Sequence, residues 1–143
     1  MTIGFTQKSA ERFFELLMKQ GVTHLFDVRL NNSSQLSGFA KRDDLEFFLR
    51  RIGNIEYQEL KDLAPTKDIL SRYQKGSIDW DAYEELYKNE IARRSVERLL
   101  TPGMLEGGCL LCSEHKPHHC HRRVAVDYLN ECWGQVLEIK HLF

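Results

Sequence analysis

Short hydrophobic stretches alternate with segments of helical periodicity along this chain, and that alternation limits its fold more than any other feature. Residues 2–4, 22–28 and 109–112 have the length and composition of buried strands. Between them, apolar residues recur three or four positions apart, as they do on the buried face of a helix. Strands that alternate with helices indicate a sheet covered on both faces. We therefore predict an α/β fold, a three-layer sandwich with a mainly parallel sheet of about five strands.

The remaining segments continue the pattern. Further strands are expected at residues 55–57 and 136–139, and helices at residues 10–20, 43–52 and 66–100, the last broken near residues 75–77. Asp43 is predicted to cap its helix, with Glu46 three residues later completing a capping-box pattern. Pro117 suits the first turn of the last helix, which Gly134 ends.

Two further segments need an interpretation. The polar residues 30–42 form a predicted loop that is long for a compact domain, and loops of this length are often functional. A stripe at helical spacing consists of Trp80, Tyr83, Tyr87 and Ile91. We interpret this stripe as core packing rather than as a platform for stacking nucleic-acid bases.

Size and charge exclude several classes of protein. A chain of 143 residues buries roughly 70% of its unfolded surface without help from metals or disulfides, so one domain over residues 1–143 is expected. The net charge of −1 argues against strong non-specific binding to nucleic acid. No leader peptide and no apolar run near ~18 residues is visible, so no membrane partner is expected. Four cysteines without a secretion signal indicate free thiols and a cytoplasmic location.

Residues 112–123, which read CSEHKPHHCHRR, concentrate the reactive side chains. They hold two of the four cysteines and four of the six histidines, and they join a predicted strand to a predicted helix. The carboxyl ends of parallel strands lie along one edge of a sheet, where ligands bind. Asp27 and Arg29 end another predicted strand, so we expect them near this segment. Unpaired N–H groups at a helix start favour anions and lower the pKa of a cysteine.

These considerations give a set of candidate site residues. The candidate catalytic residues are Cys112, Glu114, Cys120, His121 and Asp27, and the candidate substrate-binding residues are Arg29, Arg122 and Ser113. Thiols and imidazole are candidate nucleophiles or orienting groups, and the carboxylates are candidate acids or bases. The planar fork of an arginine suits carboxylate or phosphate. A simple ion pair between Asp27 and Arg29 is an equally weighted alternative.

Known motifs fit only in part. A metal site from Cys112, Cys120 and His121 is kept as an alternative, whereas Cys109 would point to the opposite face of its strand. A phosphatase-like loop fails because Cys112 and Arg122 are ten residues apart and Pro117 removes an amide. No GxGxxG, Walker or GxSxG sequence is present, and no cofactor is expected. A nucleic-acid-binding module is the other alternative, using Arg50, Arg51, Lys116, Arg122 and Arg123.

The chain resembles the family called domain of unknown function 488. The resemblance rests on Thr2-Ile3-Gly4, Asp27-Val28-Arg29, the Ser/Asn-rich loop to Phe39, and a C-x-E-x5-C-H-R run from Cys112 to Arg122. Many members carry a proline after the Asp-Val-Arg element, where this chain has Leu30-Asn31-Asn32-Ser33. The resemblance implies an α/β fold and a shared site built from these motifs, and it implies no particular reaction.

The leading hypothesis from the sequence is an enzyme acting on a phosphate-bearing small molecule, a nucleotide or a nucleic-acid end. Its expected partner is an anionic small-molecule ligand. Whether the protein is an enzyme at all, and in which oligomeric state it exists, stays open at this stage.

Overall fold

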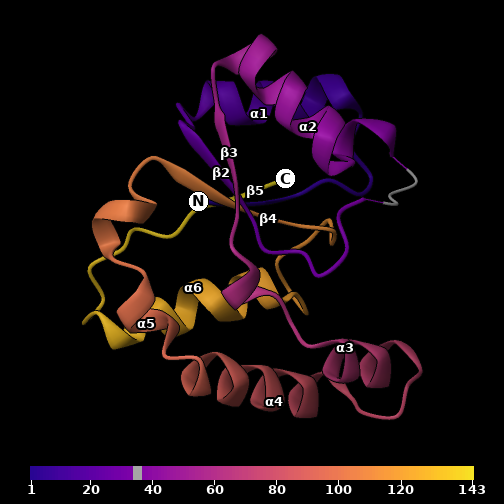
Figure 1. The fold of residues 1–143 in the computed structure, drawn as a ribbon, viewed down its shortest axis with the longest axis vertical. Helices are drawn as coiled ribbons and strands as arrows, with labels where there is room; N and C mark the ends of the chain where they lie inside the picture. Colours follow the sequence, from indigo (N-terminus) through magenta and orange to yellow (C-terminus); the bar gives the residue numbers. More distant parts are fainter. Residues whose placement is uncertain (34–36) are drawn as a thin grey trace.

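The computed structural model describes residues 1–33 and 37–143 and has three layers, with a sheet between two groups of helices (Figure 1). The sheet consists of β1 (Thr2–Gly4), β2 (His24–Asp27), β3 (Glu56–Glu59), β4 (Gly108–Cys112) and β5 (His141–Leu142). The strand order is β3-β2-β4-β1-β5, and every neighbouring pair is parallel. The predicted α/β sandwich with a parallel sheet is confirmed.

The helices divide between the two faces of the sheet. They are α1 (Ala10–Lys19), α2 (Arg42–Phe48) with a continuing π-helical turn (Leu49–Gly53), α3 (Lys67–Gln74), α4 (Trp80–Arg93), α5 (Val96–Leu99) and α6 (His121–Cys132). Helices α1 and α2 cover one face, and α4, α5 and α6 cover the other (Figure 1). None of the helices in the described residues has both the length and the apolar character needed to cross a membrane.

Alternation along the strands creates a separate core on each face. Leu25 of β2 and Leu111 of β4 pack with the buried residues of α1 and α2. Phe26 and Leu110, one position away, pack with those of α4 and α6. Successive side chains of a strand point to opposite faces, so a buried parallel strand contributes to both cores. Each fully buried side chain of this size contributes about 1.5–3 kcal/mol to folding.

The topology places the end of β4 at a point where the connections diverge. The chain leaves β1 and β2 into helices on one face, and it leaves β4, which lies between them, into α6 on the other face. Ligands of parallel sheets bind where neighbouring strands diverge in this way. The last residue of β4 is Cys112.

Three expected element boundaries are wrong. Asp43 is not a cap, because it lies in the first turn of α2 and Lys41 occupies the cap position. Pro117 lies before α6, whose N-cap is Cys120. The final strand is β5 rather than residues 136–139, because the Asn130 side chain engages the Leu137 backbone, accepting from its N–H (2.7 Å) and donating to its carbonyl (3.3 Å). Those groups are therefore not available to the sheet.

The described part of the predicted 30–42 loop contains a short 3-10 helix (Gly38–Ala40), and α2 begins at Arg42. Residues 34–36 of this loop lie outside the described residues.

Candidate active site

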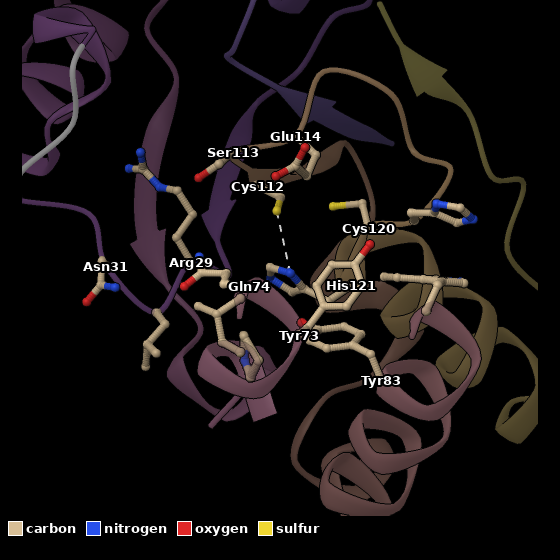
Figure 2. A pocket seen from close by; sticks show the side chains of 15 residues that line it. Arg29, Asn31, Tyr73, Gln74, Tyr83, Cys112, Ser113, Glu114, Cys120 and His121 are labelled. Carbon is tan, nitrogen blue, oxygen red and sulfur yellow. Dashed lines mark hydrogen bonds between the residues drawn. The ribbon is translucent and has the colours of Figure 1, made fainter. Parts of the chain in front are cut away.

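Cys112 and His121 form a contact pair where β4 and α6 approach each other (Figure 2). The Cys112 Sγ lies 3.5 Å from the His121 Nδ1. The other ring nitrogen, Nε2, lies 2.9 Å from the carbonyl oxygen of Val28. A carbonyl only accepts hydrogen bonds, so Nε2 carries a proton and donates to it. Nδ1 is therefore the nitrogen that shares or takes the proton of the thiol.

Cys120 adds a second sulfur beside this pair. The Sγ atoms of Cys112 and Cys120 and a ring nitrogen of His121 all lie within 4.8 Å of one another, and all three residues are buried. Both sulfurs face the same space in Figure 2. The Arg122 Nη1 donates to the Cys120 Sγ at 3.2 Å. Two thiols, an imidazole and a guanidinium thus share one small volume.

Arg122 is fully buried behind the sulfurs and does not line the pocket. Its Nη1 and Nη2 donate to the backbone carbonyls of Glu114 (2.6 Å) and His115 (3.2 Å), and its Nε donates to the Thr2 hydroxyl (3.3 Å). Among the ion pairs of the described residues, none involves Arg122. A buried cation without a carboxylate partner lowers the cost of negative charge on both nearby sulfurs, those of Cys112 and Cys120.

The acid–base properties of the three groups are coupled. Burial opposes ionisation of Cys112, but hydrogen bonding from Cys120 and the charge of His121 outweigh it and hold the pKa of Cys112 well below its usual value. Burial likewise opposes charge on His121, and the adjacent Cys112 nevertheless raises the pKa of His121. Burial and the neighbouring Cys112 raise the pKa of Cys120. These directions favour negative charge on Cys112 over Cys120, and positive charge on His121 beside it.

A pocket of about 360 Å³ opens beside these groups. Its walls come from the end of β2 (Arg29, Leu30, Asn31), from α3 and α4 (Leu70, Tyr73, Gln74, Trp80, Tyr83) and from the 112–121 segment (Cys112, Ser113, Glu114, His119, Cys120, His121), with Pro65 completing them. Burial, together with the negative charge of Cys112, raises the pKa of Glu114. A carboxyl group that keeps its proton longer than usual is suited to act as an acid.

Helix α4 contributes an aromatic wall to the pocket, whereas the spacing of its aromatic residues predicts core packing alone. Tyr83, Tyr87 and Ile91 are buried as predicted. Trp80 stacks on both Tyr83 and His119, with ring centroids 5.2 and 5.0 Å apart. The Tyr87 ring meets His121 edge to face at 5.6 Å. The same stripe therefore packs the core and supports the site, a double role that its regular spacing does not reveal.

Asp27 and Arg29 pair with each other at the side of the pocket. Both oxygens of the Asp27 carboxylate accept from the Arg29 side chain, at 2.8 and 2.7 Å, and the Tyr57 hydroxyl donates to it at 2.7 Å. Burial opposes the charge, but Arg29 and Tyr57 lower the pKa of Asp27. Arg29 also donates to the Ala40 carbonyl, at 2.8 Å. Asp27 does not line the pocket, whereas Arg29 does.

This ion pair has a consequence for the residue between its partners. The Arg29 backbone N–H also donates to the Asp27 carboxylate, at 3.1 Å. Asp27 thus binds both the backbone and the side chain of Arg29 and fixes the conformation of residues 27–29. That turn presents the Val28 carbonyl to His121. Sequence reasoning missed Val28 because a backbone group leaves no signal in residue type.

The fold and the site together define a parallel α/β protein with a Cys-Cys-His group at the point where its connections diverge. The family model described as "Domain of unknown function DUF488" matches residues 9–129, which is most of the chain. The protein therefore belongs to this family, as its motifs indicated. Searches of curated proteins and of solved structures gave no significant match.

Proposed function

We propose that this protein is an enzyme that acts on a small anionic molecule, including phosphate-bearing ones, with the Cys112 sulfur as nucleophile. The observation that carries the proposal is the 3.5 Å contact between the Cys112 Sγ and the His121 Nδ1. An imidazole held in one tautomer by Val28 can take the thiol proton and stabilise the thiolate. Because Cys112 lines the pocket, an electrophilic atom of a bound ligand can reach it.

Other groups have roles that follow from their positions. Glu114 lines the pocket and has a raised pKa, so it would protonate a leaving group. The start of α6 and the buried Arg122 supply positive potential next to the sulfurs. Arg29 lines the pocket, although Asp27 and Ala40 already accept three of its N–H groups. The positive field, more than direct arginine contacts, would attract the anion.

The test compares two alkylating reagents that differ only in charge. Iodoacetate and iodoacetamide would be reacted with a Cys132→Ser variant, which lacks the exposed cysteine, and modification of Cys112 followed by mass spectrometry. We expect Cys112 to react at neutral pH. Its rate with iodoacetate divided by its rate with iodoacetamide should exceed the same ratio for Cys132 in the parent chain. Inorganic phosphate should slow the reaction with iodoacetate.

Cys109 provides a matched control for a buried sulfur outside the pocket. It belongs to the core beneath α1 and α2, and burial raises its pKa to about 12. In the same experiment Cys109 should stay unmodified, and a Cys109→Ala variant should leave the Cys112 rate unchanged. If Cys112 reacts no faster than Cys132 and shows no preference for the anionic reagent, the proposal is wrong.

A metal centre is the second candidate function. Cys112, Cys120 and His121 could together hold an ion such as zinc, because thiolates and imidazole are its preferred ligands. The hydrogen bond from His121 to Val28 is the kind of outer contact that orients a metal-bound imidazole. Elemental analysis of protein purified without an affinity tag tests this candidate. Stoichiometric zinc that is lost in Cys120→Ser would favour it over the thiolate enzyme.

The nucleic-acid alternative receives less support from the positions of its residues. Arg122 is fully buried, and Arg123 is paired with Glu84 at 2.9 Å and Asp127 at 3.1 Å. Both would have to leave these positions to contact a phosphate backbone.

A further inference from the structure

The two pocket cysteines face each other across a short loop. Residues 113–119 connect Cys112, at the end of β4, to Cys120, at the cap of α6. Their sulfurs lie within 4.8 Å of each other, both line the pocket, and both are free thiols. Cys109 and Cys132 do not line this pocket. The Cys112 and Cys120 sulfurs are therefore placed to react with each other and with a molecule bound in the pocket.

The two sulfurs have different surroundings. Cys112 contacts the His121 imidazole, whereas Cys120 accepts a hydrogen bond from Arg122. Two neighbouring free thiols, one of them in contact with an imidazole, are an arrangement from which disulfides form, because the first sulfur attacks an oxidant and the second resolves the product.

We infer that Cys112 and Cys120 form a redox-active pair that reduces a hydroperoxide. This inference rests on the proposed function, because it uses the same nucleophilic Cys112. The Cys112 thiolate attacks the terminal, hydrogen-bearing oxygen of ROOH; the S–O bond forms and the O–O bond breaks. The departing RO⁻ takes a proton from His121 or Glu114 and leaves as ROH. Cys112 is then a sulfenic acid, and the hydroperoxide has been reduced by two electrons.

Cys120 completes the sequence. Its sulfur attacks the Cys112 sulfur; the S–S bond forms, the S–O bond breaks, and the hydroxide leaves as water with the Cys120 proton. The sum is two thiols and ROOH giving one disulfide, ROH and water. An external thiol, such as dithiothreitol in the assay, would return the disulfide to two thiols by exchange.

The local structure allows the sulfurs to approach. A disulfide has an S–S length of about 2.05 Å, so sulfurs at the observed spacing need to close by less than ~3 Å. The carbonyls of Glu114 and His115 are held by Arg122, which fixes the Cys112 end of the loop. Lys116 and His118 are exposed, so the middle of the loop is less tightly packed than its Cys112 end.

The experiment uses the full chain with Cys132→Ser, reduced and then treated with one equivalent of hydrogen peroxide. We expect loss of both pocket thiols, a mass lower by two hydrogens, and a cross-linked peptide joining Cys112 to Cys120. In a Cys120→Ser variant, Cys112 should instead be trapped as a sulfenic acid that dimedone labels. The Cys109→Ala variant, also with Cys132→Ser, should form the disulfide at the parent rate.

Iodoacetamide modification of the same samples separates the two proposals. If Cys112 is alkylated rapidly at neutral pH but peroxide produces no disulfide, the redox inference is wrong and the nucleophile proposal stands. If Cys112 is neither alkylated nor oxidised faster than Cys132 in the parent chain, both are wrong. We expect Cys112 to be oxidised at about ten times the rate of Cys132 or more, because reactivity towards peroxide follows thiolate character.

Discussion

The His121 side chain is hydrogen-bonded to the main chain of Val28, with 2.9 Å between Nε2 and the carbonyl oxygen. This bond joins the first residue of α6 to the end of β2, and it leaves Nδ1 to face Cys112. The imidazole is thereby oriented by a backbone group that no side-chain substitution at position 28 removes.

His121→Asn should make Cys112 much less reactive. Without the imidazole, the charge and the hydrogen bond of His121 no longer lower the pKa of Cys112, so this pKa rises and the thiolate fraction at pH 7 falls. A rise of one unit in the pKa lowers the thiolate fraction about tenfold. We therefore expect alkylation of Cys112 at neutral pH to be at least ten times slower. The rate should be measured from about pH 5 to 9 beside His118→Asn, which removes an exposed imidazole nearby. Equal rates in the two variants would contradict the role given to His121.

Asp27→Asn should destabilise the fold strongly. The substitution leaves the buried Arg29 without its carboxylate, which typically costs about 3–5 kcal/mol. Urea denaturation measures the loss, and Asp43→Asn is the matched control because its pair with Arg42 is exposed. A denaturation midpoint shared by the two variants would show that the buried pair does not hold this turn.

The same carboxylate predicts a pH dependence of stability. The pKa of Asp27 is lower in the folded protein than in the unfolded chain, where it is ~3.9. Its stabilising contribution is therefore present above that value and is lost as the pH falls through the folded-state pKa. Denaturation curves between about pH 5 and 2.5 should show a steeper loss in the parent protein than in Asp27→Asn. Parallel curves would contradict this assignment.

Arg122→Lys should disturb the site although it keeps the charge. A lysine cannot reproduce the bonds to the Glu114 and His115 carbonyls together with the contact to Cys120. Losing two bonds from a charged donor costs about 3 kcal/mol or more, measured by thermal or urea unfolding. The neighbouring Arg123→Lys keeps a cation opposite Glu84 and should have a smaller effect. The reverse order of effects would rule out the structural role of Arg122.

Gly4→Ala should displace the site loop. A Cβ on Gly4 would overlap the Glu114 carbonyl group, which is backbone and cannot rotate away. We expect a loss of at least about 1–3 kcal/mol and a changed rate of Cys112 alkylation. Gly38→Ala is the control, because a Cβ there meets nothing within 4 Å. Alkylation that stays unchanged in Gly4→Ala would mean that the loop tolerates the shift.

Much of the fold could be predicted because its signals are local. The periodicity of α1 and the apolar runs of β2 and β4 each specify their own element. The strand predicted at residues 136–139 is absent because of a contact with another element, α6. Residues 136–139 have strand composition, but the Asn130 side chain on α6 takes the backbone groups of Leu137. A tertiary hydrogen bond of this kind outweighs a weak local preference.

A candidate site could be predicted from the sequence because its cysteines, histidine and carboxylate lie in one segment. Cys112, Glu114, Cys120 and His121 were candidates, and all line the pocket. Arg122 was expected at the ligand and lies instead behind the loop, a difference set by which face of α6 it occupies. The start of α6 was placed too early because Arg122 holds the preceding carbonyls in a non-helical loop.

The sheet order also bears on how the protein forms during translation. Within the described residues, β1 pairs with β4 on one side and β5 on the other, so it gains a neighbour once residues 108–112 have left the ribosome. Pairings so distant along the chain form late and slowly. The thiolate-stabilising surroundings of position 112 need that same strand in place. A nascent or truncated chain therefore carries an ordinary thiol there, and the reactivity that we propose for Cys112 would develop only as folding completes.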